Sequence, residues 1–299
     1  MKKGSYIPDD KIVNPPSPDL VYKEVKRNFT FSYPQKEFKP VKKIFNDFKA
    51  LFSGKYPGYR ACDTPYHDIK HSSDVFLAAS RIVDGYNLEN PKHILPSRKV
   101  IILYAASLFH DSGFIPKTDD RASSGAENLS VHEERSQDFT ESYMLENGFT
   151  DEEALLACTL IECTNLFRKI SDLEFNSDTD RMLGCIMGTA DLIGQMASRT
   201  YLERLPSLYQ EFSQAEMPVY FSEVDLVQRT GDFYETVVKK RLQEEFRGVM
   251  RYTKKHFRER RNIFEDIYKV SIENQIDYIQ KIVKEYPDTY KEKLRRTES

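Results

Sequence analysis

Hydrophobic residues recur at intervals of three and four along most of the chain. Between Val41 and Phe52, and again between Val75 and Tyr86, they form a single stripe. This period is typical of helices that bury one face. No strand-like alternation with hairpin turns occurs, so the sequence predicts an all-α protein. Further helices are expected at about 130–146, 151–163 and 182–194, and then to about 282 with breaks near Pro206 and at 216–222.

The segment 100–109 is apolar at nearly every position and ends at His110-Asp111. A helix that is hydrophobic on most sides must be buried against several neighbours. A histidine and an aspartate at its end are costly to bury unless something pairs with them. Gly113 then permits a chain reversal that a residue with a Cβ would resist. The pair therefore either caps a buried helix or binds a metal ion.

Proline positions and changes in residue character predict the domain organisation. Five prolines interrupt residues 1–38, which we expect to form an extended lead-in pinned by aromatic residues. Residues 39–215 are predicted to form the main helical domain, and residues 216–299 a helical extension packed on it. The polar segment 115–129 is predicted to be a surface loop.

Composition narrows the class of protein. The chain has 299 residues, 30% of them charged and 12% aromatic, and its net charge of -3 argues against nucleic acid as a partner of the whole molecule. A basic stretch from Lys239 to Arg261 could still bind phosphate-rich partners, although we favour a solvated helix face packed on the bundle. Four cysteines without a Cys-x-x-Cys pair, no secretory signal and no apolar run of about 20 residues predict a cytoplasmic protein without a membrane span.

Other residues could join His110 and Asp111 at a metal ion. His67 and His71 lie four residues apart, on the edge of the core-facing stripe that continues at Val75. Asp191 lies on an apolar stripe, where an ionised carboxylate needs a cation or several hydrogen-bond donors. Imidazole and carboxylate ligands suit Zn, Mn, Fe or Mg. His93 and His256, by contrast, are expected to be exposed to solvent.

The order of these motifs resembles the HD-domain superfamily of metal-dependent phosphohydrolases, and is similar to the catalytic domains of cyclic-nucleotide phosphodiesterases. The resemblance covers roughly residues 55–215. The motifs that carry it are Tyr66-His67-Asp68-x-x-His71, Phe109-His110-Asp111-Ser112-Gly113-Phe114, His132-Glu133-Glu134-Arg135-Ser136 and Thr189-Ala190-Asp191-Leu192-Ile193-Gly194.

The resemblance implies an HD-type helical bundle that holds a divalent metal ion through four side chains. It also implies that Asp111 can bridge to a second ion and that His67 protonates the leaving oxygen, while His132 contacts a second ion or the phosphate. Glu133 and Lys70 are further candidates for such contacts. The four implied ligands are His71, His110, Asp111 and Asp191.

Two departures from the family pattern bear on the number of metal ions. Phosphodiesterases carry a further histidine after the His-Asp pair, where this chain reads Ser112-Gly113-Phe114. Residues Ile161-Glu162-Cys163-Thr164 stand where some two-metal HD enzymes have paired histidines. One metal ion is therefore expected, and a second is left open.

The function expected from these residues is hydrolysis of a phosphomonoester or phosphodiester of a nucleotide or cyclic nucleotide by attack of a metal-bound water. The partner would then be a small phosphate ester or nucleotide, and self-association into a homo-oligomer is left open. The alternative is a non-catalytic HD module that binds a nucleotide or metal as a sensor or interaction domain.

Overall fold

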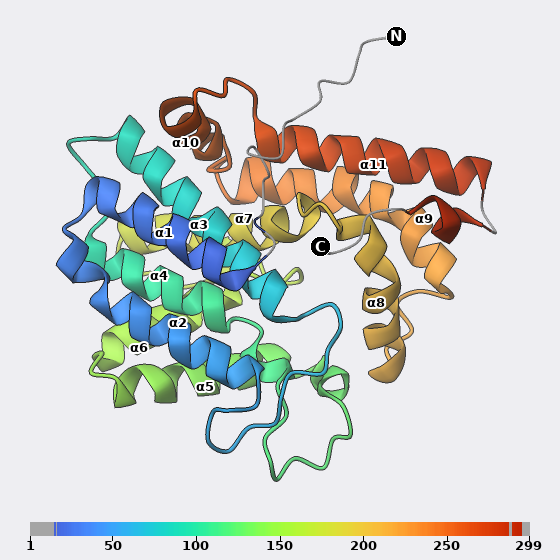
Figure 1. The fold of residues 1–299 in the computed structure, drawn as a ribbon, viewed down its shortest axis with the longest axis horizontal. Coiled ribbons are helices and arrows are strands. Elements are labelled where there is room, and N and C mark those ends of the chain that lie inside the picture. Colours follow the sequence, from blue (N-terminus) through green and yellow to red (C-terminus); the bar gives the residue numbers. More distant parts are fainter. Residues whose placement is uncertain (1–14, 16, 287–288, 295–299) are drawn as a thin grey trace.

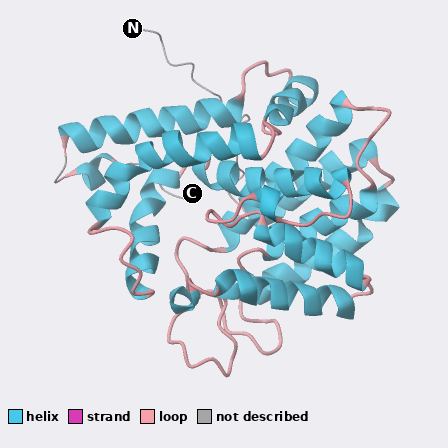
Figure 2. Cartoon of the chain, turned by 180° about the vertical axis from the view of Figure 1, so that it is seen from behind, coloured by secondary structure: helices cyan, strands magenta, loops and turns pink. Residues whose placement is uncertain are grey.

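The chain folds as an all-α protein, as the sequence predicts. The computed structural model describes residue 15, residues 17–286 and residues 289–294. Over these residues it contains eleven α-helices joined by loops and short helical turns, and no strand (Figure 2). Two isolated β-bridges, Ser53 with Ala61 and Tyr59 with Lys117, tie loops together. Within the same residues, no helix has both the length and the apolar character needed to cross a bilayer.

The first seven α-helices include those that the hydrophobic period predicts at residues 41–52 and 75–86. Their bounds are α1 Pro18–Ser32, α2 Lys39–Phe52, α3 Ile69–Glu89, α4 Ser97–Phe109, α5 His132–Glu146, α6 Asp151–Glu162 and α7 Asp178–Met196. The remaining α-helices are α8 Tyr201–Gln214, α9 Glu223–Phe233, α10 Arg251–Arg261 and α11 Ile267–Glu285. Pro206 lies inside α8, where the sequence predicts a break.

Helices α3 and α7 lie at the centre and pack directly on each other. Helices α1, α2 and α4 run alongside, with α5 and α6 below them, while α8, α9 and α11 gather at the opposite end (Figure 1). Close packing on α7 depends on small residues such as Gly184 and Gly188. A Cβ on Gly188 would lie 2.3 Å from Cζ of Phe246, so any larger side chain there would push the C-terminal segment away.

The expected extended lead-in is wrong for residues 18–38. Residues 18–32 form α1, and residues 35–38 form a short 3-10 turn. Pro18 occupies the start of α1, where its missing N–H costs nothing, and the Ser17 side chain caps the helix by accepting from the N–H of Leu20. Prolines here begin a helix instead of interrupting one. Residues 1–14 and 16 of the predicted lead-in lie outside the described residues.

The basic stretch 239–261 lies on the bundle with most of its cations outward, as we favour from the sequence, but Arg241 is buried and donates to the carbonyl oxygens of Leu166 and Arg168. Tyr252 and Phe257 are buried, and α10 packs along α3. Two short π-helical turns, Tyr234–Val238 and Arg241–Glu245, precede α10. The exposed cations of α10 are Arg251, Lys254, Arg258 and Arg261.

The expectation that His256 is exposed is wrong, whereas His93 is exposed as expected. The His256 ring is fully buried, and its Nδ1 lies 2.7 Å from Oδ2 of Asp84 on α3. Arg260, one turn further along α10, donates to both oxygens of the same carboxylate at 2.8 and 3.0 Å. The sequence of α10 does not indicate these contacts, because the acceptor, Asp84, lies 172 residues before His256 and 176 residues before Arg260.

A second buried ion pair joins α1 to α3 and α11. Arg81 is 1% exposed and donates to Oε1 of Glu24 through Nε and Nη2, at 3.1 and 2.7 Å. Its Nη1 donates to the hydroxyl of Tyr268 at 3.0 Å. Because the guanidinium is far from water, its stabilisation depends on these partners.

Replacing Arg81 with alanine should lower the free energy of unfolding by about 3–5 kcal/mol, because the largely buried Glu24 would lose its main partner and keep only the longer contact with Arg261 at 3.5 Å. Urea denaturation of the full chain measures this change. The control is Lys43→Ala, which removes the exposed pair with Asp47 and should cost less than about 1 kcal/mol. Equal losses in the two variants would contradict the structural role of Arg81.

Replacing Asp84 with asparagine should make stability less dependent on acid pH. Burial alone would raise the pKa of Asp84, but His256 and Arg260 outweigh it and hold the pKa below 3.8. A carboxylate with a lowered folded pKa stabilises the protein above its unfolded pKa, and this stabilisation is lost as the pH falls through the folded value. The gap in stability between wild type and Asp84→Asn should therefore be full at neutral pH and narrow below about pH 3.8. A gap that stays constant in urea denaturation across this range would contradict the prediction.

Candidate metal centre

Four side chains from three helices and one turn converge in the core. His71 lies in the first turn of α3, His110 directly follows α4, Asp111 precedes the short turn Ser112–Phe114, and Asp191 lies in the second half of α7. Their exposed fractions are 3%, 2%, 4% and 8%. The apolar run of α4 thus ends with its polar residues inside the protein, next to two other helices.

Local sequence explains the position of His71. Asp68 is the N-cap of α3, and its carboxylate accepts from the N–H of His71 at 2.9 Å. Arg204 on α8 holds the same carboxylate at 2.8 Å. The helix therefore starts after His67, so the expectation that both histidines lie on one helix is wrong for His67.

The expectation that Gly113 permits a chain reversal is wrong. Its φ is not among the positive values of the described residues. A Cβ at this position would instead lie 1.9 Å from the carbonyl oxygen of His132. Gly113 therefore allows the start of α5 to pack directly on the turn that carries Asp111.

Donor atoms of His71, His110 and Asp191 all lie within 4.8 Å of one another, as the ligands of one ion do, and Asp111 lies beside the two histidines. Nε2 of His71 lies 3.2 Å from Nε2 of His110, 3.1 Å from Oδ2 of Asp111 and 3.3 Å from Oδ1 of Asp191. Nε2 of His110 lies 3.2 Å from Oδ2 of Asp111 and 3.6 Å from Oδ1 of Asp191. Adjacent ligands at 2.0–2.1 Å from a common ion are roughly 3.0–3.4 Å apart. The residues present therefore fit a divalent metal ion.

Hydrogen bonding also favours a metal ion over a simple ion-pair cluster. Oδ2 of Asp111 is buried and accepts no hydrogen bond, although two imidazole nitrogens lie within 3.2 Å. Nδ1 of His110 lies 3.0 Å from the carbonyl oxygen of Ser107, an arrangement that places the proton on Nδ1 and a lone pair on Nε2. Unsatisfied oxygen and nitrogen lone pairs thus face the same point.

The pKa shifts show the strength of the local field. Burial alone would lower the pKa of both histidines, but the adjacent carboxylates raise it to about 9 for His71 and about 10 for His110. Burial would raise the pKa of Asp191, but the two histidines lower it to about 2. Two protonated nitrogens 3.2 Å apart repel each other. One divalent cation would balance the carboxylates without that repulsion.

His67 lies beside this centre and is held by a buried glutamate. Its ring centroid is 5.7 Å from that of His71, and its side chain is 18% exposed. Nδ1 lies 2.5 Å from Oε2 of Glu211, whose side chain is fully buried. The other oxygen of Glu211 accepts from the backbone N–H groups of Tyr66 and His67 at 2.6 and 3.3 Å. Glu211 therefore fixes both the backbone and the ring of His67 and leaves Nε2 available.

Phe114 supports two of the candidate histidines. His67 stacks on it at 4.4 Å between centroids and His132 at 4.3 Å. Nδ1 of His132 lies 2.6 Å from the carbonyl oxygen of Leu129, so its Nε2 is available too. The rings of His67 and His132 are 6.4 Å apart. The structure therefore brings His132 to the side of the centre where His67 lies.

The other two candidates for a second metal or phosphate contact have partners elsewhere. Oε2 of Glu133 accepts from Nδ2 of Asn165 at 2.5 Å. The Lys70 ammonium donates to Oδ2 of the buried Asp74, also at 2.5 Å. Neither side chain joins the four converging ligands. A second metal ion would have to be held mainly by Asp111 and His132.

Glu211 and Phe114 are the residues that sequence reasoning missed. The interaction of Glu211 with His67 spans 144 residues, and no local pattern indicates it. Phe114 lies three residues after Asp111 but resembles an ordinary core residue. Arg181, on the same helix as Asp191, donates to the carbonyl of Ile170 and lies over the ring of Phe175.

Comparison with known proteins places the chain in a family. No curated protein matches it in sequence. The family model described as Npun_R2479-like matches residues 58–273, a span that includes the four converging residues as well as His67 and Glu211. Because this span covers well over half of the sequence, the chain belongs to the Npun_R2479-like family.

Proposed function

We propose that the protein is a metal-dependent phosphohydrolase of the HD type that cleaves a phosphomonoester or phosphodiester of a nucleotide or cyclic nucleotide. The observation that carries the proposal is the convergence of four side chains, in which the Nε2 atoms of His71 and His110 each lie 3.1–3.6 Å from an oxygen of Asp111 and of Asp191. The order of motifs in the sequence supports the same class of reaction.

His71, His110, Asp111 and Asp191 would hold the metal ion. When bound, a divalent ion polarises a phosphoryl oxygen and lowers the pKa of water. The side chains themselves contribute a fixed geometry, because all four are buried. Two carboxylates and two neutral imidazoles would leave the loaded site without net charge, so an anionic phosphate ester could approach without repulsion.

His67 would serve as the general acid. Its Nε2 is the available nitrogen, and the Glu211 carboxylate at Nδ1 holds the ring in place so that Nε2 can donate to the leaving oxygen. Burying Glu211 would be costly without such a partner. Glu211 is therefore a positioning residue that acts through His67.

A non-catalytic metal or nucleotide sensor is the second candidate. The pairing of Glu133 with Asn165 favours it, because that carboxylate is then not directed at a second metal ion. A screen separates the two candidates, using bis-p-nitrophenyl phosphate, cyclic nucleotides, and nucleoside mono- and triphosphates with Mn, Mg, Fe or Zn. Hydrolysis of none of these combinations by a metal-loaded protein would favour the sensor.

Removing either His110 or Asp191 should abolish metal binding and hydrolysis together. His110→Ala and Asp191→Ala each remove a buried ligand, and we expect metal content to fall at least about tenfold. Elemental analysis of the purified chain beside the hydrolysis screen measures both effects. The control is His93→Ala, because His93 is exposed and lies in a loop. Wild-type metal content in both ligand variants would show that the centre is wrongly assigned.

Glu211→Gln should lower kcat by about 10–100-fold and leave metal content and KM nearly unchanged, because the amide keeps the shape but not the charge that supports His67. Steady-state kinetics and elemental analysis of the same preparations test this. Glu216→Gln, an exposed position just after α8, is the matched control. A parallel loss of metal, or a change confined to KM, would argue against a positioning role through His67.

A further inference from the structure

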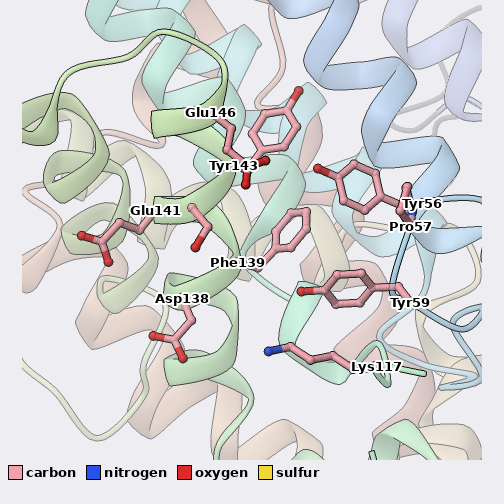
Figure 3. A pocket seen from close by; sticks show the side chains of 10 residues that line it. Tyr56, Pro57, Tyr59, Lys117, Asp138, Phe139, Glu141, Tyr143 and Glu146 are labelled. Carbon is pink, nitrogen blue, oxygen red and sulfur yellow. The ribbon is translucent and has the colours of Figure 1, made fainter. Parts of the chain in front are cut away.

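A cavity of about 840 Å³ lies between the loop after α2, the segment around Lys117 and one face of α5. Figure 3 shows Tyr56 and Tyr59 facing α5, with Phe139 between these tyrosines and the helix. Its size is that of a pocket for a small molecule. None of the converging metal-centre residues lines it, so any occupant would bind apart from that centre.

Aromatic rings form one wall of the cavity. Phe139 makes edge-to-face contacts with Tyr56 at 5.6 Å and with Tyr59 at 5.4 Å between centroids. Neither tyrosine hydroxyl has a hydrogen-bond partner among the hydrogen bonds found in the described part of the chain. Aromatic faces bind methylene groups and, through their negative potential, ammonium groups. The wall therefore suits an apolar chain that carries positive charge.

The lining that α5 contributes is also acidic. Asp138, Glu141 and Glu146 lie on the same helix as Phe139 and line the cavity, against the single cation of Lys117. All three carboxylates are exposed, and none forms an ion pair with a described residue. Eight residues of helix separate Asp138 from Glu146, a rise of about 12 Å. Figure 3 shows Lys117 near the Asp138 end and Glu146 beside Tyr143 at the other end.

We propose that this cavity binds an aliphatic polyamine. Carboxylates spread over about two turns of helix require positive charges that are separated along a chain, and the aromatic wall between them requires methylene groups. A metal ion would satisfy the carboxylates but not the aromatic wall. A monoamine would reach only one end. A basic peptide would need more contact surface than the cavity itself offers.

The cavity is separate from the metal centre. Its floor residue Phe139 packs on Phe109 at 5.1 Å between centroids, and Phe109 directly precedes His110. The polyamine site thus lies next to the end of α4, and the candidate metal ligands His110 and Asp111 follow that end directly. Binding can be measured directly and requires no catalytic activity.

Isothermal titration of the full chain with spermidine at low ionic strength tests the proposal. We expect one saturable site, weakened at least about tenfold in the Asp138→Asn/Glu146→Gln double variant and several-fold in Tyr59→Leu, which removes the aromatic face. Lys117→Ala should tighten binding, because it removes the one opposing cation. Asp277→Asn/Glu174→Gln makes the same change of charge at exposed positions outside the cavity and should bind like wild type.

Three results would overturn the proposal. The first is absence of saturable spermidine binding by the wild-type chain. The second is an equal loss of affinity in the cavity and control double variants, which would indicate attraction by net charge alone. The third is binding of butylamine or of a lysine-rich peptide as tightly as spermidine. The double variant alters only exposed side chains, so it keeps the test valid even if Tyr59→Leu does not fold.

Discussion

Burial of two imidazoles and two carboxylates at one point is the constraint on which the rest of the structure depends. Each charge would be unstable alone in the core, so α3, α4 and α7 must meet where their polar side chains can contact one another. Gly194 serves this requirement on α7, where a Cβ would lie 3.1–3.2 Å from the backbone of Asp74 and Val75 on α3. The bundle is therefore organised by a polar centre inside an otherwise apolar core.

Contacts between residues distant in sequence then equip this centre for chemistry. Helix α8 reaches the segment before α3 through Glu211, which holds His67, and through Arg204, which holds Asp68. The same helix thus fixes the start of α3 and the ring beside it. A displacement of α8 would move His67 relative to His71, so the C-terminal half of the chain controls the geometry of residues near position 70.

The sequence predicts what depends on local pattern and misses what depends on distant partners. The apolar period predicts α2, α3 and α4, and polar residues that interrupt apolar stripes point to His71, His110 and Asp191. The same reasoning fails at Pro18, because a proline that begins a helix and one that breaks it look alike until Ser17 is known to cap it. It fails for His256 and Glu211 because their partners lie 172 and 144 residues away.

The energetics of Glu211 bear on the choice between enzyme and sensor. A metal sensor needs the four converging ligands and gains nothing from a fifth polar group beside them. Glu211 is fully buried, and desolvating a carboxylate costs several kcal/mol unless it is compensated (about 1–3 kcal/mol or more per lost hydrogen bond). That cost is offset here by three contacts, two with His67 and one with the backbone of Tyr66 beside it. A fold that accepts a buried charge to fix one partly exposed imidazole next to a candidate metal centre is more consistent with proton transfer at that imidazole than with recognition alone.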